Sequence, residues 1–134
     1  YDPSSGAFFL RNTIAPGPAD LVFTYGPPGM TPIVGDWNGD GVDTVGVYAA
    51  GTGAFFLKNA NASGGADLVF NYGGGGAVPL AGDWNGDGID TVGISTPATG
   101  TFFLRNTNSS GVADIVFSYG AGGATPVMGN WDGQ

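Results

Sequence analysis

Carboxylate and amide side chains alternate in one stretch of the chain, and nearly the same stretch returns 47 residues later. In the first copy Asp36, Asn38 and Asp40 stand at positions 1, 3 and 5, followed by Gly41 and Val42. This spacing turns three oxygen-bearing side chains toward one point, while the glycine lets the backbone curl and position 7 can add its main-chain carbonyl. The pattern predicts an oxygen cage for a hard cation such as Ca²⁺.

The second copy has the same types of ligand at the same positions. Its cage residues are Asp83, Asn85, Asp87 and Ile89. A further aspartate stands at position 8 of each copy, as Asp43 and Asp90. The simpler interpretation is a pair of Asn-Gly or Asp-Gly hairpin turns, but two copies with the same ligand spacing favour calcium. A third loop over 129–134 has Gln134 at position 5, so we expect two complete sites and not three.

These loops must be positioned by a chain that is almost entirely a repeat of 47 residues. Phe-Phe-Leu begins at Phe8, Phe55 and Phe102, and the tryptophans recur at the same interval. We divide the chain, one domain over 1–134, at these intervals. The repeats are 1–42, 43–89 and 90–134.

Each full repeat contains four runs rich in β-branched and aromatic residues, separated by Gly, Ser, Asn and Pro. In the middle repeat the predicted strands are 43–48, 54–59, 67–72 and 78–84. The sequence therefore predicts an all-β chain of three tandem, four-stranded antiparallel repeats.

Both faces of the predicted strands are apolar. In the run 67–72, Leu68 and Phe70 point to one face and Val69 to the other, because side chains alternate along a strand. Such sheets are expected to be covered on both sides. Stacked, β-propeller-like blades satisfy that condition, and a β-trefoil is the alternative architecture with three repeats.

Charged residues outside the loops also repeat. Basic residues close the second predicted strand of each repeat, and aspartates open the third. The basic residues are Arg11, Lys58 and Arg105, and the acidic ones are Asp20, Asp67 and Asp114. An antiparallel hairpin would bring each pair together as a cross-strand ion pair.

The composition restricts the chemistry. The chain has no Cys and no His, and its formal net charge is −8. Such a surface repels nucleic acid and anionic membranes, and the chain has no apolar run long enough for membrane insertion. Most of the aspartates are equivalent between repeats, whereas an active site normally breaks repeat symmetry. We therefore predict that the protein is not an enzyme.

The Gly-Asp-Trp-Asn-Gly-Asp-Gly loop and the β-branched strand after it resemble the FG-GAP and VCBS-type repeats of integrin-α-like β-propellers. The resemblance covers the whole chain as a repeat unit. It implies four-stranded blades, Ca²⁺ in the loop between the last strand of one blade and the first strand of the next, and an extracellular or cell-surface location. It also implies the ligands. They are Asp36, Asn38, Asp40 and the Val42 carbonyl, and Asp83, Asn85, Asp87 and the Ile89 carbonyl.

The chain departs from the family pattern at the last ligand. The family places a carboxylate at position 9, where this chain has Thr44 and Thr91. Asp43 and Asp90 stand one residue earlier, and a shift of one residue turns a strand side chain to the other face. The sixth ligand is therefore left open between these groups and a water molecule.

These observations predict a calcium-binding module with a structural, self-assembly or adhesion role. A lectin is the alternative, because recurring Trp and Tyr residues such as Trp37 and Tyr25 could contact a glycan, although they could equally fill the core. Asn61 and Asn108 lie in equivalent glycosylation sequons. The third repeat lacks the counterpart of 88–94, so we expect neighbouring blades or other copies of the chain to join it head-to-tail in an array, ring or fibre.

Overall fold

The computed structural model describes residues 1–129, so the third loop from Asn130 onward lies outside the described residues. This part of the chain forms ten β-strands, and it contains no helix long and apolar enough to cross a membrane. The strands are β1 (Ala7–Leu10), β2 (Leu21–Thr24), β3 (Thr31–Gly35), β4 (Thr44–Ala49), β5 (Ala54–Leu57), β6 (Leu68–Asn71), β7 (Val78–Gly82), β8 (Thr91–Thr96), β9 (Thr101–Leu104) and β10 (Ile115–Ser118). The all-β prediction is confirmed, and β4 to β7 each begin within one residue of the expected position.

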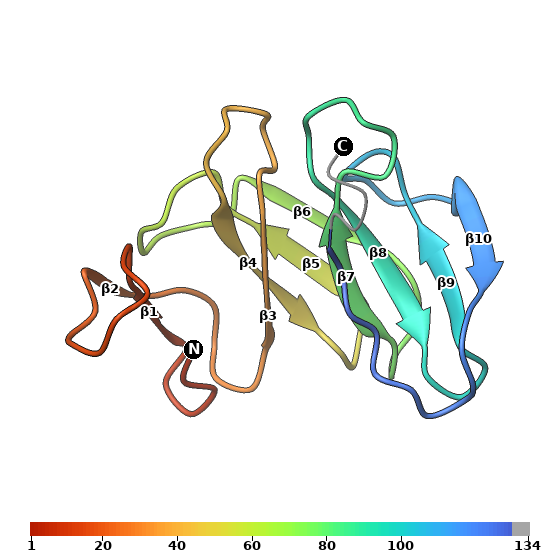
Figure 1. Ribbon diagram of the computed structural model, residues 1–134, viewed down its shortest axis with the longest axis horizontal. Helices are drawn as coiled ribbons and strands as arrows, with labels where there is room; N and C mark the ends of the chain where they lie inside the picture. Colours follow the sequence, from red (N-terminus) through yellow and green to blue (C-terminus); the bar gives the residue numbers. More distant parts are fainter. Residues whose placement is uncertain (130–134) are drawn as a thin grey trace.

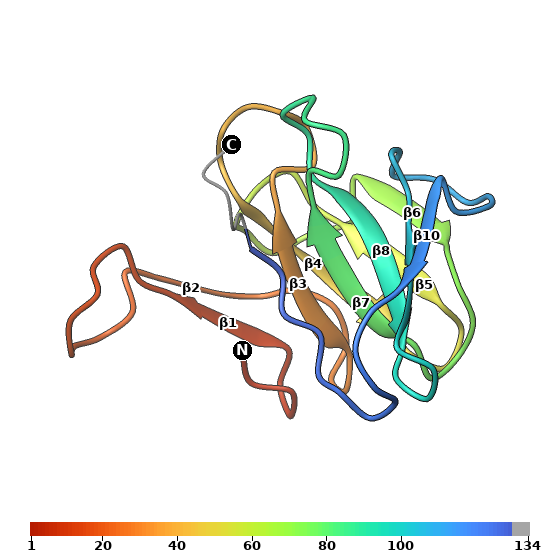
Figure 2. The same ribbon diagram turned by 45° about the vertical axis from the view of Figure 1, so that its right-hand side comes forward.

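The strands form three antiparallel sheets, none of which is closed. The first sheet is β1-β2, the second is β3-β4-β5-β6, and the third is β7-β8-β9-β10. Figures 1 and 2 show the second and third sheets face to face, with the small first sheet beside the second. The expectation of four strands in each sheet is therefore correct for two sheets, and the first has two strands among the described residues.

The sheets are offset by one strand from the sequence repeats. β3 comes from the first repeat, yet it pairs with β4 of the second repeat, in register from Thr31 opposite Tyr48 to Gly35 opposite Thr44. β7 pairs with β8 in the same way. Each Asp-rich loop thus closes a hairpin inside one sheet, and the expectation that it joins two blades is wrong. A short connection favours antiparallel pairing of the two strands that it joins.

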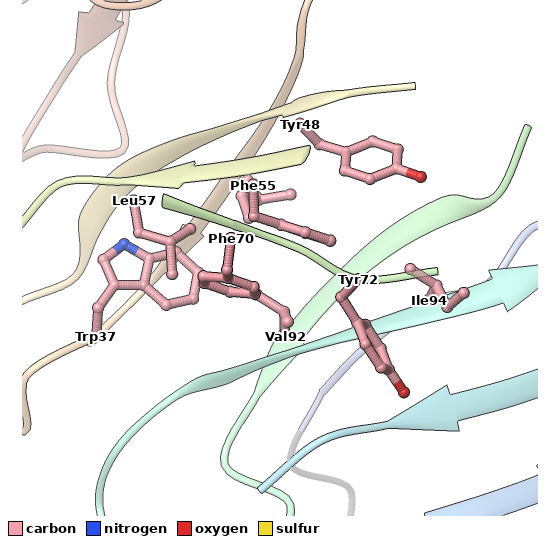
Figure 3. Packing of buried hydrophobic residues seen from close by; sticks show 9 residues of the cluster. Trp37, Tyr48, Phe55, Leu57, Phe70, Tyr72, Val92 and Ile94 are labelled. Atoms are coloured by element: carbon pink, nitrogen blue, oxygen red, sulfur yellow. The ribbon is translucent and has the colours of Figure 1, made fainter. Parts of the chain in front are cut away.

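The sheets pack an aromatic face onto an aliphatic face. Phe55, Phe70 and Tyr72 of the second sheet and its following turn lie against Val92 and Ile94 of the third (Figure 3). The contact between the first and second sheets repeats this arrangement 47 residues earlier in the chain, with Phe8, Phe23 and Tyr25 against Val45 and Val47. Burial of these side chains is the main force that holds the sheets together, because each large apolar side chain contributes about 1.5–3 kcal/mol when fully buried.

Coverage on both faces is confirmed for the central strands and is wrong at the edges. All but the last residue of β4 and of β8 are buried. The outward side chain of Val69 on the edge strand β6 is 61% exposed. The reason is that the contact faces are centred on β4 and β8, the strands that carry the β-branched residues, so the outer side of an edge strand has no facing strand.

Candidate metal loops

The two Asp-rich loops lie at the same end of the molecule. The first connects β3 to β4 and the second connects β7 to β8, and Figure 1 shows both at the upper end of their sheets. The two loops are in contact with each other. A Cβ atom added to Gly39 of the first loop would lie only 3.0 Å from a side-chain carbon of Ile89 in the second. The repeat therefore places two candidate sites side by side.

The carboxylate at position 1 organises the backbone of each loop. In the first loop Asp36 Oδ1 accepts hydrogen bonds from the amides of Gly39 at 2.8 Å and Asp40 at 3.1 Å. Asp36 Oδ2 accepts one from the amide of Gly41 at 2.7 Å. Gly41 has φ of +83°, a left-handed conformation that glycine adopts without a steric penalty. The glycine at position 6 is thus required by the same turn that directs three amides at the aspartate.

The residues at positions 3 and 5 complete the cluster. Asn38 Nδ2 donates to Asp40 Oδ2 at 3.0 Å, and Asn38 Oδ1 accepts from the Asp40 amide at 3.2 Å. Asp40 Oδ1 accepts from the Val42 amide at 2.9 Å. The side chains at positions 1, 3 and 5 are therefore gathered on one turn of the loop.

The second loop reproduces this network. Asp83 accepts from the amides of Gly86, Asp87 and Gly88 at 2.8, 3.1 and 2.8 Å. Asn85 Nδ2 donates to Asp87 Oδ2 at 2.9 Å, and the Ile89 amide donates to Asp87 Oδ1 at 2.9 Å. Two loops from separate parts of the chain thus adopt the same arrangement.

Backbone amides stabilise the ionised form of the carboxylate at position 1. The amide of Gly88, with further amides of the loop, lowers the pKa of Asp83, although burial opposes this shift. At Asp36 burial raises the pKa, but the combined hydrogen bonds from loop amides outweigh it and lower the pKa overall. Both groups are therefore anionic at neutral pH, which is the state that a cation requires.

The donor set of each loop fits a hard cation. Its side-chain donors are two carboxylates and one amide oxygen, oxygen ligands of the kind that Ca²⁺ takes, and the main-chain carbonyl at position 7 is the fourth donor that the sequence predicts. The carboxylate oxygens have lone pairs beyond those used by the amides, and the loops are exposed to solvent. Within residues 1–129 no group of three or more His, Cys, Asp or Glu is gathered as a metal site, so each loop offers two carboxylates and not three.

Asp90 has a role that sequence reasoning missed. Its Oδ2 accepts a hydrogen bond from the Asp36 amide at 2.9 Å, and its own amide donates to the Asp36 carbonyl at 2.8 Å. Asp90 is part-buried, and burial raises its pKa, helped by the nearby charges of Asp43, Asp36 and Asp83. This aspartate therefore joins the start of the neighbouring loop, which belongs to a different sheet.

The remaining candidates for the sixth ligand are engaged differently. Asp43 is exposed, and its main-chain carbonyl accepts from Asn61 Nδ2 at 3.0 Å. The hydroxyl of Thr44 donates to the Gly35 carbonyl at 3.4 Å, and that of Thr91 donates to the Arg105 carbonyl at 2.6 Å. Both threonine side chains are buried in their sheets, and their hydroxyls are used in hydrogen bonds to main-chain carbonyls.

The two sequon asparagines are used inside the fold. Asn61 Nδ2 bonds the Asp43 carbonyl, and Asn108 Nδ2 bonds the Asp90 carbonyl at 2.9 Å. The Val92 amide also donates to Asn108 Oδ1 at 3.1 Å. These side chains therefore hold the end of each Asp-rich loop, a role that the sequence signal of a sequon did not reveal.

The expected cross-strand ion pair occurs once among the described residues, between Arg105 and Asp114 at 3.6 Å. All three basic side chains, Arg105 included, donate to main-chain carbonyls of the loop that follows them, as Lys58 Nζ does to the Gly65 carbonyl at 3.0 Å. The aspartates accept from a backbone amide across the hairpin, as Asp67 does from Asn59 at 2.7 Å. The basic and acidic residues of these pairs therefore bond mainly to carbonyls and amides of the backbone, and only one pair in the described part of the chain bonds side chain to side chain.

Comparison of the chain with protein-family models, with curated proteins and with solved structures gives no match.

Proposed function

We propose that this chain is a non-catalytic, calcium-binding repeat module with a structural role outside the cell. The observation that carries the proposal is that two loops, 47 residues apart, hold an aspartate, an asparagine and an aspartate in the same hydrogen-bonded arrangement. When bound, Ca²⁺ would supply a fixed positive charge that draws these oxygen groups together. The chain's own residues then hold the two loops in place through Asp90.

The stacking of the sheets supports an array of propeller-like blades as in FG-GAP and VCBS-type repeats. Each contact uses the same aromatic face and the same aliphatic face. A β-trefoil closes its repeats around a common barrel, whereas the three sheets here are open. We infer that another sheet of this repeat, from a neighbouring blade or a second copy, continues the stack head-to-tail.

The alternative function, a lectin, has less support. Trp37, Tyr25 and Tyr72, three of the aromatic residues considered for sugar contact, are at most 5% exposed. Their equivalence between repeats is therefore explained by packing. Of that aromatic set, Tyr119 is exposed, at 78%.

Calcium titration tests the proposal. We expect two ions per chain, with dissociation constants on the order of 10⁻⁴ to 10⁻³ M, as in extracellular modules. At a calcium concentration of about 100 times the dissociation constant, each ion should add about 2.7 kcal/mol to the free energy of unfolding. Isothermal titration calorimetry and thermal unfolding with and without a chelator measure the two effects.

Variants assign the ions to the loops. Asp40→Ala and Asp87→Ala should each remove one ion, and the double variant should remove both. Asp2→Asn, which also removes one negative charge but lies at the N-terminus, is the matched control and should keep both ions. A chain that takes up no stoichiometric calcium, or a double variant that still binds two ions, would contradict the proposal.

A further inference from the structure

The loop between the second and third strands of a sequence repeat reaches onto the preceding sheet. Between β5 and β6, Ser63 Oγ accepts a hydrogen bond from the amide of Thr24, the last residue of the edge strand β2, at 3.3 Å. Between β9 and β10, Ser110 Oγ accepts one from the amide of Asn71, the last residue of the edge strand β6, at 3.3 Å. We call these loops arms, and they comprise residues 59–66 and 106–113. Figure 1 shows the arm between β5 and β6 extending toward the first sheet.

An asparagine two residues before each serine holds the arm to its own sheet. Asn61 Nδ2 donates to the Asp43 carbonyl at 3.0 Å, just before β4. Asn108 Nδ2 donates to the Asp90 carbonyl at 2.9 Å, just before β8. The Asn-x-Ser pattern of the two sequons therefore has a structural use in both copies, because its asparagine fixes the arm and its serine bonds the neighbouring sheet.

The first repeat has an arm of the same length without either residue. Ile14 stands in place of Asn61, and Pro16 stands in place of Ser63. Ile14 is fully exposed, and Figure 2 shows the loop from β1 to β2 projecting away from the second and third sheets. A proline side chain has no hydrogen-bonding group, so this arm cannot bond a strand edge as the two serines do.

The third sheet offers the same surface to a neighbour. Ser118, the last residue of β10, is exposed and corresponds to Thr24 and Asn71. Each serine arm comes from the repeat after the sheet that it bonds, and the described part of the chain has no repeat after the third sheet. Phe117 and Tyr119 are 44% and 78% exposed beside this edge. The edge amide and the aromatic face together form the surface that a serine arm and an aliphatic face cover on the other two sheets.

We propose that the third sheet binds a further blade of this repeat whose arm carries asparagine and serine at the positions of Asn61 and Ser63, in preference to the first sheet of a second copy. This inference rests on the head-to-tail stacking proposed above and names the partner that the stack selects. One hydrogen bond changes an equilibrium constant by about two- to ten-fold. The arm therefore sets the choice of neighbour, while the apolar faces supply most of the affinity.

The first sheet of a second copy is the weaker partner. It can place Phe9 and Val22, which are 54% and 57% exposed, against the aromatic face. Phe56, the equivalent of Phe9, packs in this way against the core between the first and second sheets. The Pro16 arm, however, brings no hydroxyl to the amide of Ser118.

Hydrogen exchange at the edge amides tests the arms inside the chain, with a chelator present so that calcium has no influence. Ser63→Ala should accelerate exchange of the Thr24 amide about two- to ten-fold and leave the Asn71 amide unchanged. Ser110→Ala should have the opposite selectivity. Thr13→Ala removes an exposed hydroxyl from the first arm and should change neither rate. Unchanged exchange at both amides in the serine variants would overturn the proposal, because the arms would then contribute nothing where the structure has them in place.

A transplanted arm tests the choice of partner. Ile14→Asn/Pro16→Ser gives the first sheet the arm residues of the other two repeats. Copies of this variant should associate about two- to ten-fold more tightly than the unaltered chain in sedimentation velocity, and the Ser118 amide should become protected from exchange in the associated state. Ile14→Asn/Pro16→Ala is the matched control, because it lacks only the hydroxyl, and it should show neither effect.

The outcomes separate this inference from the stacking on which it rests. If the unaltered chain associates and Ile14→Asn/Pro16→Ser associates no more tightly, the arm does not select the partner, although the stacking stands. An equal gain in the alanine control would also overturn the inference, because the hydroxyl would then be irrelevant. Absence of association in all three chains would contradict both the inference and the stacking.

Discussion

Single carboxylates at equivalent positions have different roles in this molecule. Asp43 and Asp90 are 47 residues apart and have identical neighbours on either side, except that Ile89 replaces Val42. Asp43 is exposed, while Asp90 is part-buried and accepts a hydrogen bond from the Asp36 amide of the adjacent sheet. The difference arises because Asp90 bonds the Asp-rich loop one repeat earlier in the chain, whereas residues 1–35 contain no such loop for Asp43 to bond.

This pair gives a matched test at the residue scale. Asp90→Ala leaves the Asp36 amide without its acceptor, and a buried donor without a partner costs about 1–3 kcal/mol. Asp43→Ala is the control, because a surface substitution of this kind usually changes stability by less than about 0.5 kcal/mol. Urea unfolding in the presence of a chelator, which excludes differences in metal binding, measures both. Equal losses in the two variants would show that the bond between the loops contributes nothing to stability.

At the scale of elements, the hairpin loops are ordered by side chains that bond the backbone. The loop from β9 to β10 depends on Arg105, whose guanidinium donates to the Val112 carbonyl at 2.5 Å and the Ser109 hydroxyl at 2.9 Å. Lys58, at the equivalent place before β6, makes one such bond, to the Gly65 carbonyl. The arginine can serve several acceptors at once because its five donors lie in one rigid plane.

We therefore expect Arg105→Met to destabilise the chain more than Lys58→Met. Methionine retains most of the apolar stem but donates no hydrogen bond, so the loss should be about 1–3 kcal/mol at Arg105 and smaller at Lys58. Amide hydrogen exchange should accelerate over 107–113 in the first variant. Unchanged exchange in that segment would mean that the loop keeps its conformation without the guanidinium.

At the scale of the whole molecule, the third sheet exposes a face that is covered in the other two. Phe117 is 44% exposed, whereas the equivalent Phe23 and Phe70 are at most 9% exposed. Tyr119 shows the same contrast with Tyr25 and Tyr72. The covering groups on the inner sheets are Val45 and Val47, or Val92 and Ile94, so the complementary surface is known from the chain itself.

Self-association should depend on this face. We expect the average mass in light scattering to rise with protein concentration, and Phe117→Asp to suppress the rise because a charge cannot be buried against an aliphatic face without a large cost. Val69→Asp places the same charge on an exposed position of the second sheet and should leave association unchanged. A chain that stays monomeric at millimolar concentration, or one that associates equally well as Phe117→Asp, would contradict the head-to-tail arrangement.

The sequence by itself determined the strands, the interval of 47 residues and the gathering of the Asp, Asn and Asp side chains in each loop. These features are local: alternation along a strand and the left-handed turn at Gly41 involve only residues near one another in the chain. Each of them can therefore be predicted from side-chain types and spacing alone.

Only the tertiary structure decided which strands share a sheet and where the equivalent residues come to differ. The pairing of β3 with β4 and the bond of Asp90 to Asp36 each connect two repeats. The exposure of Phe117 differs from that of the equivalent residues in the other repeats. A repeat is translationally symmetric, so its sequence cannot say which copy has a neighbour on a given face.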